Sequence, residues 1–177
     1  MENIILGLLL LQSRTIYQLR KRINEGLNLM YSCSTGSIQA TLKKLLKCGY
    51  ICVSEIAEGG KNKKLYSITE EGTKYFNSWI NSPIDGKVSK NPELAKIYFM
   101  GFSQTGVRAN LIENYLNELR KIHSELEKIC AEGERMSTEF PENEILFYQL
   151  QTANYGRDLM KFNIEWYRNL LNNIRSE

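Results

Sequence analysis

The 177 residues are enough for one ordinary domain, or for two small ones, with a buried core. Hydrophobic residues make up 42% and charged residues 24% of the chain, which excludes a disordered or fibrous protein. The net charge of +3 hides a split, because residues 1–80 carry 11 Lys and Arg against 6 Asp and Glu, whereas residues 81–177 carry 12 against 14. We therefore expect the basic first part and the mildly acidic second part to meet different partners.

The chain begins with the apolar run IILGLLLL at 4–11. Glu2 precedes the run, no basic flank or cleavage site accompanies it, and eight residues are too few to span a bilayer. The run predicts a buried helix in a cytoplasmic protein that does not associate with membranes.

Two helices are expected next. Thr15 and Gln18 form a capping-box pattern at the start of the first, whose buried stripe is Ile16, Leu19, Ile23 and Leu27. The second is expected over 35–48, with Ser34 as its N-cap and Gly49 just past its end. Its predicted buried face holds Ile38, Leu42, Leu45 and Leu46, and its outer face holds Gly36, Ala40, Lys43, Lys44 and Lys47, with Ser37 and Gln39 on the flanks.

Two strands are predicted over 50–55 and 64–69, because both segments are rich in β-branched and aromatic residues. The sequence AEGGKNK at 57–63 is expected to be a loop that carries Lys61 and Lys63, with Lys64 at its exit. Thr69 is the predicted N-cap of a further helix, whose buried positions are expected to be Phe76, Trp79 and Ile80.

This order of elements, three helices followed by a hairpin with a basic tip, is typical of a winged helix-turn-helix. Helix 35–48 fits the major groove of DNA, and the wing at 57–64 can reach the backbone or the minor groove. The alternative reading is that these lysines form only a solvated surface.

Residues 4–80 resemble the PadR family of transcriptional regulators. The resemblance rests on IILGLLL at 4–10 plus Leu11, Tyr17, STGSIQATLKKLLKCGYI at 34–51, GGKNKKLYSITEEG at 59–72, and Trp79. The second part of the chain resembles the helical C-terminal region of the longer members. The matching segments are ELAKIYFMGFS at 93–103, the long helix to Ile129, and NIEWYRNLL at 163–171.

The resemblance implies a homodimeric repressor that occupies a promoter operator. Its two recognition helices would enter successive major grooves of the DNA. The sequence departs from the usual pattern at Ile16, where a Gly is common, and at Gln39 and Ala40, where Tyr and Pro are common. The alternative that these departures keep open is a winged-helix interaction protein that dimerises but has lost specific DNA binding. The residues expected to contact DNA are Ser34, Thr35, Gly36, Ser37, Gln39, Ala40, Lys43, Lys44, Lys61, Lys63 and Lys64.

The second part of the chain is expected to supply the dimer. We predict a DNA-binding domain over 1–82, a linker over 83–91 and a mainly α-helical dimerisation domain over 92–177, whose first helix starts near Asn91 and Pro92. One long helix is predicted over 105–132, a break over 133–141 and a second long helix over 142–175. The expected dimer interface is Leu111, Tyr115, Leu119, Ile122, Leu126, Leu159, Phe162, Trp166 and Leu170, and Ile129 and Ile174 continue the two apolar stripes.

A small aromatic or hydrophobic effector is a further expected partner, and ordinary helix packing is the alternative role for the residues that would line its pocket. These residues are Tyr98, Phe99, Phe102, Tyr155, Phe162 and Trp166.

Catalysis, a metal and a cofactor are not expected. The only histidine is His123, and the chain has no GxxxxGK[ST] phosphate loop and no recognisable carboxylate pair. The cysteines Cys33, Cys48, Cys52 and Cys130 lack CxxC spacing and are expected to be small buried side chains, with a thiol sensor or metal clip on the first three as the alternative.

Overall fold

The computed structural model describes residues 1–26, 34–58, 61–84, 91 and 93–176. The chain divides into two compact units, Met1–Lys87 and Val88–Glu177. Leu27, Cys33 and Pro92, which the sequence analysis singled out, lie outside the described residues, as do most of the linker and the side chain of Lys61.

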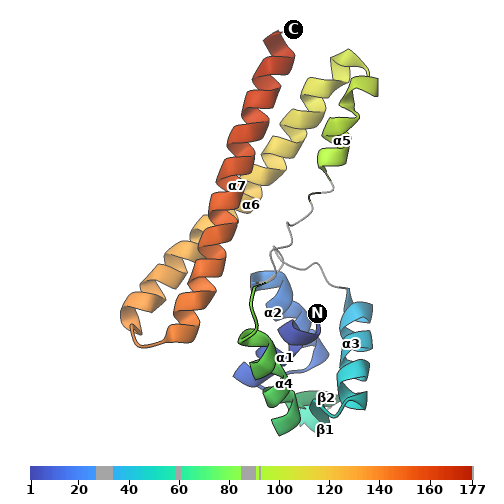
Figure 1. The fold of residues 1–177 in the computed structure, drawn as a ribbon, viewed down its shortest axis with the longest axis vertical. Helices are drawn as coiled ribbons and strands as arrows, with labels where there is room; N and C mark the ends of the chain where they lie inside the picture. Colours follow the sequence, from blue (N-terminus) through green and yellow to red (C-terminus); the bar gives the residue numbers. More distant parts are fainter. Residues whose placement is uncertain (27–33, 59–60, 85–90, 92, 177) are drawn as a thin grey trace. The chain divides into compact units, whose positions relative to one another are not determined.

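In its described part, the first unit consists of four helices and one β-hairpin (Figure 1). The helices are α1 (Glu2–Leu11), α2 (Ile16–Gly26), α3 (Thr35–Lys47) and α4 (Glu70–Ile80), and the strands are β1 (Ile51–Glu58) and β2 (Lys61–Ile68). Helix α1 contacts α3, α4 and β2, and α3 also contacts α2 and β1. This is the predicted winged helix-turn-helix order of elements.

Local hydrogen bonds explain where α2 and α3 begin. The Thr15 amide donates to the Gln18 side chain at 2.9 Å and the Gln18 amide donates to Thr15 Oγ1 at 3.3 Å, which is the expected capping box. Ser34 Oγ accepts from the Ser37 amide at 3.1 Å and starts α3. At the other end, Gly49 adopts a φ of +72°, a left-handed conformation that glycine adopts without steric cost.

The hairpin is longer than the sequence indicated. The antiparallel register runs from Ile51 opposite Ile68 to Glu58 opposite Lys61, so the expected loop over 57–63 is wrong for residues 57, 58 and 61–63, which belong to the strands. Pairing along the ladder outweighs the low strand propensity of Glu, Lys and Asn. Backbone bonds of 3.0 Å in both directions between Arg14 and Tyr66 add a bridge to the second strand.

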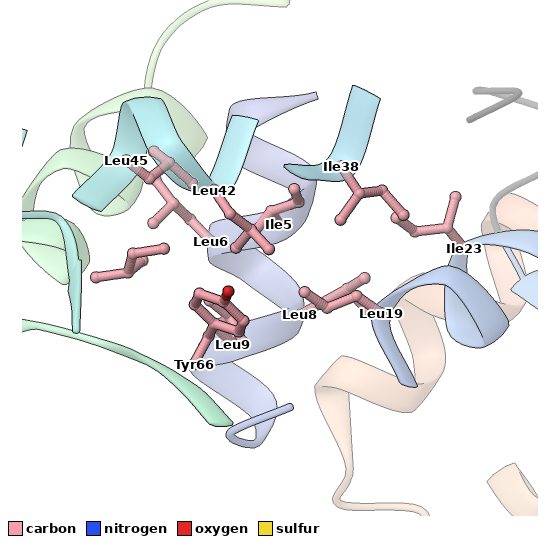
Figure 2. Packing of buried hydrophobic residues seen from close by; sticks show 11 residues of the cluster. Ile5, Leu6, Leu8, Leu9, Leu19, Ile23, Ile38, Leu42, Leu45 and Tyr66 are labelled. Atoms are coloured by element: carbon pink, nitrogen blue, oxygen red, sulfur yellow. The ribbon is translucent and has the colours of Figure 1, made fainter. Parts of the chain in front are cut away.

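The core of this unit collects apolar side chains from every element except α4, and Phe76 of α4 packs against it (Figure 2). Its buried members are Ile5, Leu6, Leu8, Leu9, Leu19, Ile23, Ile38, Leu42, Leu45, Ile51 and Tyr66. Three expectations about burial were wrong, because Leu46, Trp79 and Ile80 are exposed, the last two by 44% and 56%. Helix α4 contacts the core through Phe76, whereas Trp79 and Ile80 in its last turn lie on the surface.

The second unit is a helical hairpin with a short helical segment before it (Figure 1). Its elements are α5 (Leu94–Tyr98), the 3₁₀ turn η1 (Met100–Phe102), α6 (Thr105–Glu139) and α7 (Glu144–Ser176). The expected break over 133–141 was largely wrong, because α6 continues through Glu139. A Cβ at Gly133 would lie 2.8 Å from Leu150 Cδ1, so Gly133 allows α7 to approach closely there.

The contact between α6 and α7 uses a different stripe from the predicted one. Its buried cluster is Ile112, Leu116, Leu119, Ile164, Tyr167 and Leu171. Leu119 and Leu126 are 3% and 6% exposed within a single chain, so the structure contradicts their assignment to a seam that faces a partner. Tyr115 and Leu170 pack against this cluster, and Leu111, Ile122, Leu159, Phe162 and Trp166 remain exposed.

A search of the described residues finds no helix that is both long and apolar enough to cross a membrane.

Candidate nucleic-acid interface

Helix α3 presents an exposed face with small residues at its start and lysines along its later turns. Its buried side is Ile38, Leu42 and Leu45, so the positions between them point outward. Among the residues of this helix and its N-cap that are expected to contact DNA, Thr35 is half-buried. The exposed ones are Ser34, Gly36, Ser37, Gln39, Ala40, Lys43 and Lys44. Small side chains let the start of the helix approach another surface closely, and the lysines supply the charge that phosphates attract.

Two of the serines already serve the helix itself. Ser34 Oγ caps the Ser37 amide, and Ser37 Oγ donates to the Ser34 carbonyl at 2.8 Å. Gln39 caps nothing within the described residues, and it is exposed on the flank of this face. Gln39 is therefore the side chain on this face best suited to read a base edge, since its amide both donates and accepts.

Lys43 and Lys44 are neighbours in sequence but differ in their electrostatic surroundings. Lys44 Nζ lies 2.7 Å from Glu2 Oε1, and this hydrogen bond raises the pKa of Lys44 above its ordinary value. The structure shows no ion pair for Lys43 within its described part. The sequence analysis missed the contact with Glu2, because 42 residues separate the partners and no spacing pattern signals it.

The hairpin carries the second group of lysines. Lys64 stands opposite Glu55 in the ladder and Lys63 opposite Ile56, and both lysines are exposed. Lys61 begins β2 opposite Glu58. The basic residues expected at the tip of a loop are therefore spread along the end of a strand.

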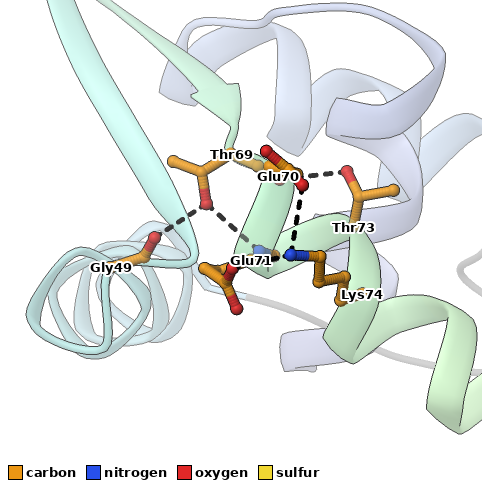
Figure 3. Close-up of polar contacts among 7 residues, drawn as sticks. Gly49, Thr69, Glu70, Glu71, Thr73 and Lys74 are labelled. Atoms are coloured by element: carbon orange, nitrogen blue, oxygen red, sulfur yellow. Dashed lines mark hydrogen bonds and ion pairs between the residues drawn. The ribbon is translucent and has the colours of Figure 1, made fainter.

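Thr69 ties the hairpin to the helices on either side of it (Figure 3). Its Oγ1 accepts from the Gly72 amide at 3.1 Å, which caps α4, and donates to the Gly49 carbonyl at 2.7 Å, just past α3. Thr73 Oγ1 donates to the Thr69 carbonyl at 3.0 Å. One threonine thus fixes where β2 ends, where α4 begins and how both sit against the end of α3.

The cysteines differ from expectation. Cys48 and Cys52 are exposed, whereas Cys130 is buried in α6 and its burial raises the pKa of the thiol. Within the described residues no three His, Cys, Asp or Glu side chains gather as a metal site would require. His123 Nδ1 lies 3.6 Å from Glu127 one turn along α6.

The aromatic residues expected to line an effector pocket do not gather around one cavity. Phe99 contacts both Tyr98 and Phe102 in and just after α5, while Tyr155, Phe162 and Trp166 are exposed on α7. Of the six, only Phe99 lines a cavity of about 270 Å³ in the second unit.

An exposed helix of small and basic residues, set beside a basic hairpin on a three-helix core, defines a winged helix-turn-helix protein. Residues 5–78 match the model of the Transcriptional regulator PadR-like family. These residues thus form a PadR-like domain, and the chain is a DNA-binding transcriptional regulator. The PadR-like regulators are not enzymes, in agreement with the sequence analysis.

Individual relatives show the same likeness over most of the chain. The Negative transcriptional regulator PadR of Bacillus subtilis (strain 168) is 28% identical over an alignment of 145 residues, and the match covers 78% of this chain and 79% of the relative. The crystal structure of Bacillus subtilis PadR in complex with operator DNA matches with a TM-score of 0.78 at 23% identity and covers 98% of both chains. The same Bacillus protein in complex with p-coumaric acid matches with a TM-score of 0.71 at 22% identity, also over 98% of both chains. The crystal structure of smu.1604c from Streptococcus mutans UA159 has a TM-score of 0.80 at 25% identity and covers 96% of this chain and 97% of its own.

Proposed function

We propose that the protein is a homodimeric repressor that binds a promoter operator, with α3 in the major groove and the hairpin end over 57–64 on the backbone or in the minor groove. The observation that carries this proposal is the outward face of α3, which is exposed, small at its start and basic further along. The likeness to a negative regulator supports repression as the direction of control. A cytoplasmic location is part of the proposal, because bacterial operator DNA lies in that compartment.

In this proposal the contacts divide into two kinds. Base edges are faced by Gly36, Gln39 and Ala40, because the small side chains in the N-terminal half of α3 let its backbone approach the bases. The second kind of contact is to phosphates, and it sets the register of the protein on the duplex. These contacts come from Lys43, Lys44, Lys61, Lys63 and Lys64, together with Ser34, Thr35 and Ser37 at the start of the helix.

The test is a titration of the full chain against its own upstream DNA over a range of salt concentrations. We expect a steep loss of affinity with salt, and a shallower loss when Lys63 and Lys64 are both changed to Ala. Lys74→Ala is the control, because Lys74 is also an exposed lysine but lies on α4, outside α3 and the hairpin. Equal affinity for random DNA would contradict the repressor and would favour the interaction protein instead.

Dimerisation through the second unit is the other part of the proposal. Helix α7 buries Ile164, Tyr167 and Leu171 against α6 but leaves Phe162 61% exposed and Trp166 40% exposed on a different side. An apolar stripe of this kind on a long helix is most economically covered by a second copy. Phe162→Glu should shift the protein to monomer in sedimentation, whereas Asn172→Glu, on a polar side of the same helix, should not. A dimer that persists in Phe162→Glu would contradict this interface.

A further inference from the structure

Lys47 lies in the last turn of α3 and is exposed, but the expected DNA contacts do not include it. Its direction follows from the helix period, because α3 buries Ile38, Leu42 and Leu45, which are at most 1% exposed (Figure 2). At about 100° per residue, Lys47 points within about 10° of the direction opposite these three side chains. Among the lysines of α3, Lys47 therefore points most directly away from the core.

Lys43 and Lys44 lie on the two flanks of this direction, each about 50° away from it. Lys44 Nζ is 2.7 Å from Glu2 Oε1, whereas Lys43 and Lys47 have no ion pair among the residues that the structure describes. Helix α3 itself contains no Asp or Glu. Lys43 and Lys47 therefore keep their charge available for a ligand, while Lys44 must first leave Glu2.

The spacing of Lys43 and Lys47 suits the DNA backbone. They are four residues apart, so their Cα atoms are separated by about 6 Å along the helix axis. Each strand of a DNA duplex carries one negative charge for about every 3.4 Å of the duplex axis. Two long side chains one turn apart can thus contact two different phosphates of one strand. Gly36 and Ala40 lie on the same side of α3 toward its start, where they let the helix approach closely.

The turn that carries Lys47 is held in place by the residues that follow it. The Gly49 and Tyr50 amides donate to carbonyl groups in the last turn of α3 at 3.0 Å, and the Gly49 carbonyl accepts from Thr69 Oγ1 at 2.7 Å. The backbone at Lys47 is therefore fixed before DNA binds. A phosphate contact from this position costs only the freedom of the lysine side chain.

We propose that Lys47 contacts the DNA backbone, and that Lys43 and Lys47, rather than Lys43 and Lys44, supply the main phosphate contacts of α3. This inference rests on the proposed function and adds a residue to it. A phosphate contact carries no sequence information, so Lys47 contributes to the binding of any duplex. Its contribution is ionic and therefore decreases as the salt concentration rises.

The test compares Lys47→Gln, which removes the charge, with Lys47→Arg, which retains it. Fluorescence anisotropy of the full chain with its labelled upstream DNA gives the affinity at several salt concentrations. For a homodimer, Lys47→Gln should lower the slope of log affinity against log salt by about 1.8, and Lys47→Arg should leave it unchanged. A random duplex should show the same change of slope in Lys47→Gln. Lys74→Gln, on α4, is the control and should keep the slope of the unaltered protein.

The outcomes separate this inference from the proposed function. An unchanged slope in Lys47→Gln, beside a lowered slope in Lys43→Gln, would overturn the inference and leave the proposed function standing. A loss of affinity in Lys47→Gln that is equal at every salt concentration would also overturn it, because that result indicates a structural role. A loss confined to the upstream DNA would assign Lys47 to a base edge and contradict the phosphate contact. If the unaltered protein shows no salt-dependent binding to DNA, the proposed function fails together with the inference.

Discussion

The two adjacent lysines of α3 offer a sharp test of how the helix meets DNA. Each phosphate neutralised by a lysine contributes about 0.9 to the salt dependence of the affinity on B-DNA, so one position in a homodimer contributes about 1.8. Lys43 has no ion pair in the described part of the structure, whereas Lys44 is held by Glu2 at 2.7 Å. Lys43→Ala should therefore lower the slope of log affinity against log salt by about 1.8, and Lys44→Ala by distinctly less.

The size of the effect is easily measured. If the affinities are equal at 1 M salt, a slope change of about 1.8 makes Lys43→Ala about 60-fold weaker at 0.1 M salt. Glu2→Gln releases Lys44 from its partner, so this variant should bind DNA more tightly at low salt and show a steeper slope. Fluorescence anisotropy with labelled upstream DNA measures all three variants. Equal slopes for the two lysine variants, together with no change in Glu2→Gln, would refute the idea that Glu2 neutralises Lys44.

Three predictions concern stability and reactivity. Thr69→Ala should lower the free energy of unfolding by about 1–3 kcal/mol, because it removes a helix cap and a hydrogen bond, whereas Thr69→Ser should change it little in urea titrations. Iodoacetamide should label Cys48 in the native protein and leave Cys130 unlabelled until the protein is unfolded. The reason is that burial shields the Cys130 thiol and raises its pKa, which keeps it protonated. Equal labelling rates for the two cysteines would contradict the burial of Cys130. The pKa values of Tyr115 and Tyr167 are raised in the folded state, so the folded protein holds these protons more tightly and stability should fall as the pH rises above about 10. Tyr167→Phe should reduce this alkaline loss in denaturant titrations, and an unchanged pH profile would show that the two tyrosines do not cause it.

Features that depend on neighbouring residues were predictable from the sequence. Thr15 with Gln18, Ser34 with Ser37, and Thr69 with Gly72 each form a bond between residues three apart, so the residue types themselves indicate the helix starts. The exposed, basic face of α3 follows in the same way from the 3.6-residue period.

Features that depend on partners distant in the chain were not predictable. Strand β1 extends to Glu58 and β2 begins at Lys61 because each strand pairs with the other, although these residues favour a loop. The pair Glu2 with Lys44 joins two helices through a contact that no spacing announces.

The two long helices show most clearly what periodicity in the sequence does not predict. Both carry apolar residues on more than one side, and periodicity reports that a side is apolar without reporting what covers it. In the structure, the contact between α6 and α7 buries Ile112, Leu116 and Tyr167, whereas Ile122 and Phe162 remain exposed.

The sequence by itself determined that this protein is a basic winged helix-turn-helix joined to an amphipathic helical arm, because caps, periodicity and charge are local properties of the chain. Only the tertiary structure decided that Lys44 of α3 is paired with Glu2 and which apolar stripe of the two long helices is internal, and it leaves the buried Tyr167 hydroxyl without a partner among the described residues. These outcomes depend on which surfaces meet, and that is settled by packing the whole chain at once.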